Sequence, residues 1–199
     1  GFEIWSCGFG IWKPEVDLEE AWMSTGDSFP IILIPFKDDP THLSIYEASQ
    51  REESVFEIEL KGEVLTRHYD WLMSQPSFKI GFSQIENSEI ILPTVQWKYA
   101  AFFKQGYLHL ITTKPQPNIH DISNRFAKVF EQTYTRFLDL QKVEAQVREA
   151  MIEASLERIR SHSMALQKSA DLEEVIKVVF TEWKKLGLDI FESNINIVD

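Results

Sequence analysis

The first thirteen residues alternate between apolar and small or polar side chains, a period of two that is typical of a strand with one buried face. Trp5, Cys7, Phe9 and Ile11 share one face of this segment, and the small residues at positions 6, 8 and 10 lie opposite. Positions 55–60 alternate in the same way. The sequence Lys104-Gln105-Gly106 lies between two further apolar segments and predicts a hairpin. The other predicted strands are 18–23, 29–36 (apolar throughout and short enough for a buried strand), 90–103 and 107–113.

Helical spacing separates these strands. Asp38-Asp39-Pro40-Thr41 opens a predicted helix over 43–51, and a second predicted helix over 62–73 is closed by Pro76. After Pro115 and Pro117, residues 121–168 are almost free of Gly and Pro and predict one long helix. Strands and helices mixed in this order, ending in a hairpin, predict an α+β domain with an antiparallel sheet, flanking helices and a long connector helix.

Apolar residues of the connector helix form a seam with alternating spacings of three and four, which is the coiled-coil pattern. Residues 126–137 are predicted to lie on their own domain, whereas the seam beyond Leu140 runs further than one small domain covers. At 152–166 the seam changes phase, a local change of winding that coiled coils tolerate. We therefore expect a parallel homodimer rather than a helix folded back on its own domain. The predicted interface residues are Leu140, Val143, Val147, Ala150, Ala154 and Ile159.

The two ends of the chain resemble each other at an offset of 186 residues. The matching pairs are Phe2/Leu188, Glu3/Asp189, Ile4/Ile190, Trp5/Phe191, Phe9/Ile195, Ile11/Ile197 and Trp12/Val198. Chance similarity between two amphipathic strands is the alternative to a true repeat. An offset this long suits tandem domains better than a solenoid. The predicted parts are a first domain over 1–120 that lacks its opening helix, the connector over 121–168, and the first helix and strand of a second domain over 169–199.

The helix of that second domain is predicted over 170–186. Ser169 is a suitable N-cap, acidic residues occupy the first turn, and Gly187 ends the helix. Its apolar face needs a partner, either another chain or the first domain.

Charge and composition narrow the function. Lys and Arg total 20 against 31 Asp and Glu, a formal net charge of −11, so the basic footprint of a nucleic-acid-binding protein is absent. No apolar run approaches the roughly 20 residues that cross a bilayer, and no signal peptide is recognisable. We expect a cytoplasmic protein without a membrane partner. The single cysteine, Cys7, is expected to pack as a small apolar residue.

Catalytic and metal-binding motifs are not found. The five histidines have no HExxH or paired spacing, and Gly8-Phe9-Gly10 lacks the third glycine and the helix of a dinucleotide site. The pairs Asp38-Asp39 and Glu52-Glu53 are expected to be solvated surface. The sequence therefore predicts no metal, no cofactor and no enzyme.

Four stretches are more distinctive: SCGFGIW (6–12), WMSTGDSFP (22–30), RFAKVFEQTYTRFLDLQKVEAQ (125–146) and LERIRSHSMALQKS (156–169). With the order of elements, they resemble the GAF-like domains of bacterial multidomain sensors, which usually end in a histidine kinase or cyclase output domain. The resemblance implies a mostly antiparallel sheet with helices across it and a ligand pocket between them. Cysteine-linked bilins, methionine sulfoxide reduction and the NKFDE signature of cyclic-nucleotide sites find no support here, so no ligand is implied.

Polar-tipped aromatic and histidine side chains are the candidates for lining such a pocket. They are Trp22, Tyr46, His68, Tyr69, Trp97 and Tyr99. Each is also a reasonable core residue. The expected function is a non-catalytic sensory module that binds a small molecule or relays a conformational signal through a dimeric helix to a downstream output domain. The alternative is a dimerisation or interaction module with no ligand.

Overall fold

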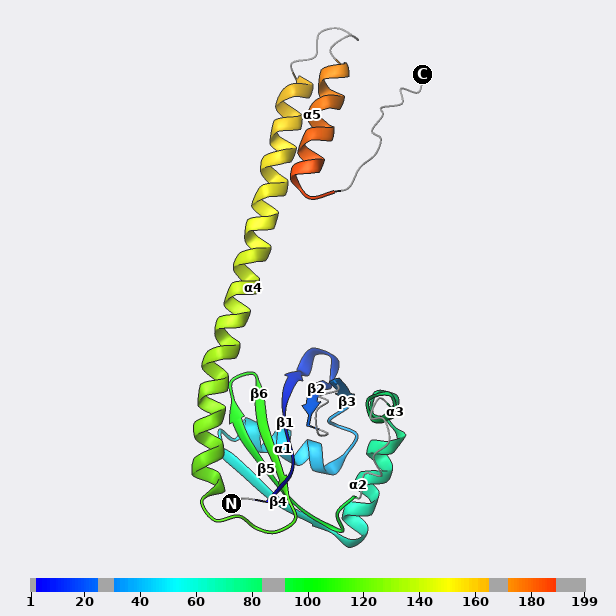
Figure 1. Cartoon of the computed structure of the whole chain (residues 1–199), viewed down its shortest axis with the longest axis vertical. Helices are drawn as coiled ribbons and strands as arrows, with labels where there is room; N and C mark the ends of the chain where they lie inside the picture. The colour runs from blue at the N-terminus through cyan, green and yellow to red at the C-terminus, as the bar shows by residue number, and fades with distance from the viewer. Residues whose placement is uncertain (1–2, 25–30, 84–91, 165–171, 189–199) are drawn as a thin grey trace. The chain divides into compact units, whose positions relative to one another are not determined.

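The computed structural model describes residues 3–24, 31–83, 92–164 and 172–188. The chain forms two compact units, residues 1–134 and residues 135–199. The first unit contains one antiparallel sheet of six strands with the order β3-β2-β1-β6-β5-β4 (Figure 1). The strands are β1 (Ile4–Lys13), β2 (Leu18–Met23), β3 (Ile31–Ile34), β4 (Val55–Lys61), β5 (Val95–Phe103) and β6 (Gly106–Thr112).

Five α-helices and a short 3-10 helix connect or follow these strands. They are η1 (Pro14–Val16), α1 (Pro40–Gln50), α2 (Gly62–Ser74), α3 (Pro76–Ser83), α4 (Ile119–Met164) and α5 (Leu172–Lys185). The first unit is thus an α+β domain, as the sequence predicts, and the hairpin at Lys104-Gln105 joins β5 to β6.

The two faces of the sheet carry different helices. Phe9 and Ile11 of β1 face the first turns of α4, where Ala127 is fully buried and Phe130 packs against Phe9. The intervening glycines, Gly8 and Gly10, face the side that carries α1 and α2. The alternation that predicts β1 therefore separates two differently packed layers. Cys7 packs beside Leu110 and Ile119, in agreement with its expected apolar role.

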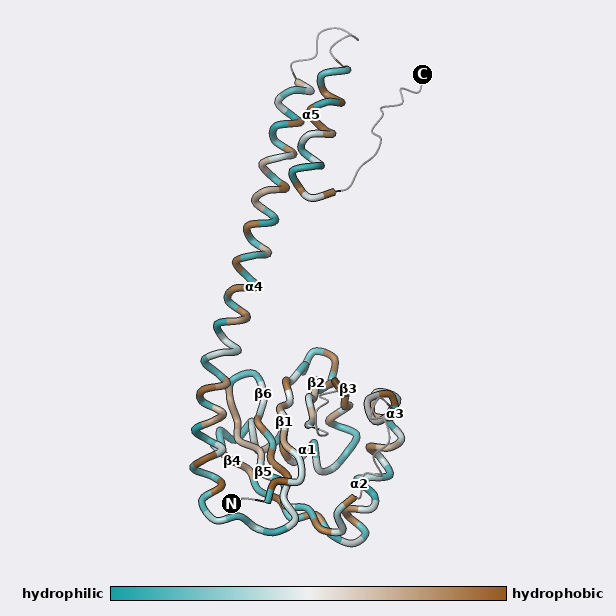
Figure 2. The backbone as a smooth tube through the Cα atoms, viewed as in Figure 1, coloured by the Kyte–Doolittle hydropathy of each residue, from teal (hydrophilic) through white to brown (hydrophobic). Residues whose placement is uncertain are grey.

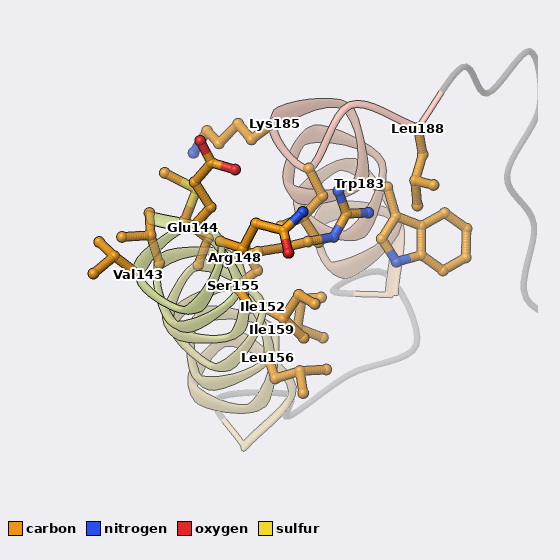
Figure 3. Close-up of a pocket in the computed structure, with 15 residues that line it drawn as sticks. Val143, Glu144, Arg148, Ile152, Ser155, Leu156, Ile159, Trp183, Lys185 and Leu188 are labelled. Carbon is orange, nitrogen blue, oxygen red and sulfur yellow. The ribbon is translucent and has the colours of Figure 1, made fainter. Parts of the chain in front are cut away.

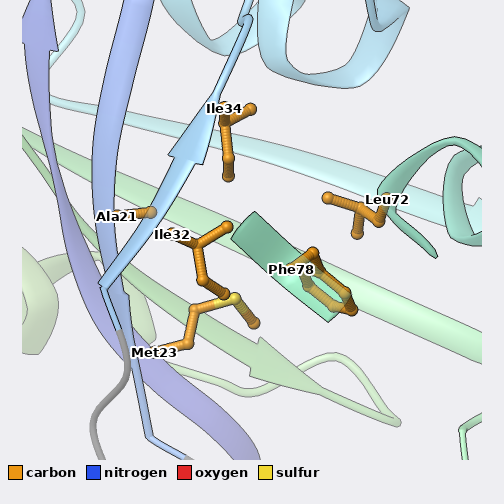
Figure 4. Packing of buried hydrophobic residues seen from close by; sticks show 6 residues of the cluster. All are labelled: Ala21, Met23, Ile32, Ile34, Leu72 and Phe78. Atoms are coloured by element: carbon orange, nitrogen blue, oxygen red, sulfur yellow. The ribbon is translucent and has the colours of Figure 1, made fainter. Parts of the chain in front are cut away.

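On the side opposite α4, an apolar cluster joins the sheet edge to α2 and α3. Figure 4 shows its side chains converging between these elements. The members of this cluster are Ala21, Met23, Ile32, Ile34, Leu72 and Phe78. Phe78 is only 3% exposed, so α3 is an integral part of the core although it has just eight residues.

Three details differ from the sequence prediction. Pro76 follows α2 and also begins α3. Proline suits the first position of a helix because a backbone N–H there would have no acceptor within the helix. Segment 29–36 is not a buried strand, since β3 is an edge strand whose Ile31 and Leu33 are 56% and 44% exposed. The Ser77 hydroxyl covers this edge by donating to the Leu33 carbonyl and accepting from its amide. β5 begins at Val95, and residues 92–94 of the predicted strand precede it, while positions 90 and 91 lie outside the described residues.

The predicted connector helix is present as α4, a single helix of 46 residues. Figure 2 shows apolar and polar residues alternating along its length. Residues 165–168, where the prediction ends, lie outside the described residues, as do residues 189–199 of the strand predicted over 187–199. α5 ends as expected: Gly187 has a φ of 79°, and the Leu188 and Gly187 amides donate to the carbonyls of Trp183 and Lys184.

Within the second unit, α5 packs against α4 through a buried carboxylate. Glu182 is 3% exposed and accepts hydrogen bonds from Ser155 (2.9 Å), Arg158 (3.0 Å) and Lys185 (2.6 Å). The hydrogen bond from Lys185 is the main reason that the pKa of Glu182 is lowered to about 2. No helix among the described residues has the length and apolar character needed to cross a membrane.

Candidate functional site

A cluster of polar and ionisable side chains is buried between the sheet and helices α1 and α2. Each member is at most 9% exposed. We call it the buried polar cluster; it consists of Glu19, Asp39, His42, His68, Lys98, Tyr107 and His109. Burying this many polar groups costs free energy unless they pair with one another, so their arrangement is informative.

Asp39 is the centre of the cluster. It has extended backbone geometry and caps α1, where Pro40 takes the first helical position and the His42 amide donates to Oδ2 at 3.1 Å. The same oxygen lies 2.9 Å from His42 Nδ1 and 3.0 Å from His68 Nδ1. The carboxylate therefore orients two imidazoles, one from its own helix and one from α2. Asp39 is 3% exposed, so the expectation that it is solvated surface is wrong.

His68 connects Asp39 to the sheet. Its Nε2 lies 2.6 Å from the Lys98 ammonium on β5. Because an ammonium can only donate, Nε2 is the accepting nitrogen and Nδ1 carries the proton that points to Asp39. The result is a buried relay from Lys98 through neutral His68 to Asp39.

The pKa values of these groups follow from burial and from their neighbours. Burial and the positive charge of Lys98 lower the pKa of His68 to about 3, and the same two causes lower the pKa of His109 to about 3. Burial lowers the pKa of Lys98 to about 8. Burial alone would raise the pKa of Asp39, but the hydrogen bonds from His42 and His68 hold it well below its usual range. Asp39 is therefore ionised, and His68 and His109 are neutral, at physiological pH.

The second half of the cluster is a carboxyl–phenol pair. Tyr107 donates to Glu19 Oε1 at 2.7 Å, and both side chains are at least 98% buried. Burial raises the pKa of Glu19, and burial together with the nearby Glu19 carboxyl raises the pKa of Tyr107 well above its usual value. The pair lies over Gly10, where an added Cβ would fall 2.3 Å from Glu19 Oε1. The glycine therefore makes room for the pair.

A small cavity of about 30 Å³ lies inside the cluster, bordered by Glu19, His42, Lys98 and His109. Among the described residues, Glu19 Oε2 and His109 Nε2 are buried without a hydrogen-bond partner. A space of this size holds on the order of one or two water molecules or one ion, since a single water needs about 10–15 Å³. It is too small for an organic ligand in this conformation.

Asp39, His42 and His68 also form a possible metal-ligand set. One ligand atom from each lies within 4.8 Å of the others, and all three residues are buried. No HExxH or paired-histidine spacing marks this set in the sequence. Its third member, His68, comes from another helix, 29 residues after Asp39. The available signal is Asp-x-x-His at the start of a helix, which by itself is also an ordinary N-cap.

The six candidates predicted from the sequence do not form one site. His68 belongs to the buried polar cluster. Trp22 stacks on Phe9 at 4.7 Å, on the α4 face, and Trp97 packs on that face beside Tyr99.

The three tyrosine candidates also lie apart. Tyr99 borders the cavity, but its hydroxyl accepts from the Gln116 amide at 3.1 Å. Tyr46 packs between Trp12 and Phe36. Tyr69 donates to the Pro93 carbonyl and accepts from Gln96, and burial raises its pKa to about 12.

The second unit carries a different kind of surface. An open apolar groove of about 1020 Å³ runs between α4 and α5. Figure 3 shows aliphatic side chains of α4, including Val143 and Ile152, and Trp183 of α5 around this groove. The predicted dimer residues Leu140, Val143 and Val147 are 53%, 53% and 48% exposed, Ala150 and Ala154 are exposed, and Ile159 is half-buried.

Comparison of the chain with protein-family models found no match, and neither the curated proteins nor the solved structures gave one.

Proposed function

We propose that this chain is a GAF-like signalling module, in which the buried polar cluster is the sensing site and α4 carries the response to a downstream histidine kinase or cyclase domain. The observation that carries the proposal is the continuity of α4. Its first turns belong to the core of the sheet domain, and the same helix continues into an exposed apolar seam.

Neighbouring residues on two strands link the cluster to α4. On β5, Lys98 faces the cluster, while Tyr99 packs with Ile119 at the start of α4. On β6, His109 faces the cluster, while Leu110 belongs to the same apolar group as Ile119. Successive strand residues point to opposite faces. A shift of either strand caused by a change in the cluster is therefore transmitted directly to α4.

The exposed seam supports homodimerisation. Leu140, Val143 and Val147 are spaced by three and four residues, and each exposes about half of its side chain. Residues with this spacing on two identical helices pack into each other as knobs and holes. A second copy of α4 is the occupant that this repeat fits, because the pattern is self-complementary in a parallel pair.

A second candidate function is a dimerisation module without any ligand. The observation that favours it is the size of the cavity, about 30 Å³, which excludes an organic molecule in this conformation. The two candidates share the dimer and differ in whether the cluster responds to a ligand.

Light scattering at tens of micromolar tests the shared part, and a dimer is expected. A monomer under these conditions would contradict both candidates. Mass spectrometry of protein purified under non-denaturing conditions separates them: a retained small molecule or ion supports the sensing module, whereas protein of the bare chain mass supports the ligand-free one.

A further inference from the structure

We propose that Asp39, His42 and His68 bind one divalent transition-metal ion, for which Zn²⁺ and Co²⁺ are suitable probes. The inference rests on the proposed function in one respect: the ion is taken to be the signal that the module senses. The metal site itself stands on the geometry of the three side chains.

The donor set suits these ions. Two imidazoles and one carboxylate are ligands for Zn²⁺ and for the neighbouring first-row metals, and they are less suited to Ca²⁺ or Mg²⁺, which prefer oxygen. All three residues are at most 5% exposed. Surface histidines and carboxylates that bind metals adventitiously lack this burial.

The spacing requires only a small adjustment. Asp39 Oδ2 lies 2.9 Å from His42 Nδ1 and 3.0 Å from His68 Nδ1. Ligand atoms around a tetrahedral Zn²⁺ with bonds of about 2.0–2.1 Å are about 3.3 Å apart. The two contacts with Asp39 would therefore lengthen by a few tenths of an ångström, and the separation of the ligand atoms of His42 and His68 lies within 4.8 Å. The ion takes the place of the two Nδ1 protons, and each imidazole then carries its single proton on Nε2. At His68 this N–H would face the Lys98 ammonium, which is also a donor, so the ammonium has to turn away when the ion binds.

The cavity inside the buried polar cluster reaches one of the three proposed ligands. His42 borders this space of about 30 Å³, together with Glu19 and His109, whereas Asp39 and His68 are not among the residues that line it. Glu19 Oε2 and His109 Nε2 are the buried atoms without a hydrogen-bond partner on its wall, among the described residues. A water molecule in this space would donate to one of them and so satisfy a polar atom that is otherwise unpaired.

The positive charge of Lys98 is expected to oppose binding of the metal ion. Its ammonium donates to His68 Nε2, on the far side of the ring from Asp39. It supplies positive charge next to the ionised carboxylate when no metal is present. Replacing Lys98 by the uncharged and similarly long methionine removes this competition, so Lys98→Met is expected to bind the metal more tightly than the wild type.

The test uses the full chain after treatment with EDTA. Co²⁺ is titrated while its visible d–d absorption is recorded, and Zn²⁺ affinity is measured by competition with a chromogenic chelator. The expected result is one ion per chain with the absorption of a nitrogen–oxygen site. His42→Gln and His68→Gln are expected to weaken binding at least 100-fold, and Lys98→Met to tighten it at least tenfold.

His120→Gln is the matched control. His120 is exposed and its Nε2 lies 2.5 Å from Glu57 Oε2, so this pair is the adventitious site most similar to the proposed one. Unchanged affinity in this variant supports the proposal, whereas loss of binding in His120→Gln alone overturns it. Binding that survives both His42→Gln and His68→Gln also overturns it, as does a wild type that binds no ion at micromolar concentration. Far-ultraviolet circular dichroism establishes that each variant is folded, and Lys98→Met keeps the test decisive where a histidine variant does not fold.

Metal binding and hydrogen exchange together distinguish failure of the metal site from failure of the sensing role. If Zn²⁺ binds as expected but hydrogen exchange in residues 135–164 is unchanged, the site stands and the relay through α4 is contradicted. If Zn²⁺ does not bind, the metal site is contradicted, while a response of α4 to another ligand remains measurable by the same exchange experiment.

Discussion

The two compact units place their polar and apolar residues in opposite ways. The sheet domain buries charged and polar groups such as Asp39, His68 and Lys98 beneath one face of its sheet. The helical unit instead exposes apolar residues, among them Val143 and Val147. Buried charge needs a paired network, and exposed apolar surface needs a covering partner. Most of the buried polar groups described in the first unit thus have partners within that unit, whereas we propose that the second unit is completed by association.

The largest effect is expected from removing the Asp39 carboxylate at the centre of the buried polar cluster. Asp39→Ala deletes the N-cap of α1 and the acceptor shared by His42 and His68. We expect a loss of about 3–5 kcal/mol in the free energy of unfolding, because the buried partners are left unpaired. Urea denaturation measures it. The matched control is Asp38→Ala, an exposed neighbour, for which about 0.5 kcal/mol or less is expected. Equal effects in the two variants would contradict the central role of Asp39.

A charged residue in the exposed apolar seam of α4 tests the proposed dimer interface of the helical unit. Val147→Glu is expected to weaken the dimer at least 100-fold, about 2.7 kcal/mol, because a carboxylate cannot be buried unpaired between two helices. Sedimentation equilibrium measures the dissociation constant. Glu149→Gln, at an exposed position two residues along α4, serves as the control and should leave the constant unchanged. A dimer that is insensitive to Val147→Glu would place the interface elsewhere.

The pH dependence of stability sharpens the account of the buried cluster. The pKa of His109 is lowered to about 3 in the folded chain, against about 6.5 in an unfolded one, so the unfolded chain binds the extra proton between these values. The stability that neutral His109 provides is present above pH 6.5 and is lost as the pH falls towards 3. Between pH 6 and 5 its contribution approaches about 1.4 kcal/mol per pH unit.

The check is the free energy of unfolding measured from pH 7 to pH 5 in the wild type and in His109→Gln. The slope of the variant should be smaller than that of the wild type by up to about 1.4 kcal/mol per pH unit, the contribution of one proton. A slope that His109→Gln does not change would mean that His109 is charged or exposed in the folded chain.

The smallest effect is expected within the helical unit. Glu182→Gln keeps the shape of the side chain but removes the charge that pairs with Arg158 and Lys185. We expect several-fold faster hydrogen exchange in α5 with little change in the sheet domain. Glu174→Gln, at an exposed position of the same helix, is the control and should have no such effect. Unaltered exchange in Glu182→Gln would assign the packing of α5 to its apolar contacts alone.

Local patterns in the sequence predict most of the fold but little of the buried cluster. The period of two at Phe9 and Ile11 and the nearly Gly- and Pro-free stretch after Pro117 each reflect one element, and the structure has β1 and α4 there. The apolar run at 29–36 predicts a buried strand, but its composition does not distinguish an edge from a central strand. Pro76 predicts the end of a helix, although proline both ends and begins helices.

The cluster depends on tertiary contacts that no local pattern contains. Asp39, His68 and Lys98 come from a loop, a helix and a strand, and the two contacts joining them span 29 and 30 residues. From spacing alone, a single polar residue in a helix or strand is predicted to be exposed to solvent. A histidine next to a tyrosine on a crossing helix is unusual, which makes His68 a candidate in the sequence, and in the structure His68 belongs to the buried polar cluster. Nothing comparable distinguishes Glu19 or His109 in the sequence.

We propose that a change in the buried polar cluster alters α4, and hydrogen exchange tests this claim most directly. Exchange of residues 135–164 is compared in the wild type, in Lys98→Met, and in Lys61→Met, whose lysine is exposed on β4. The account predicts that Lys98→Met changes these rates at least threefold and that Lys61→Met leaves them as in the wild type. Identical rates in all three proteins would contradict the claim.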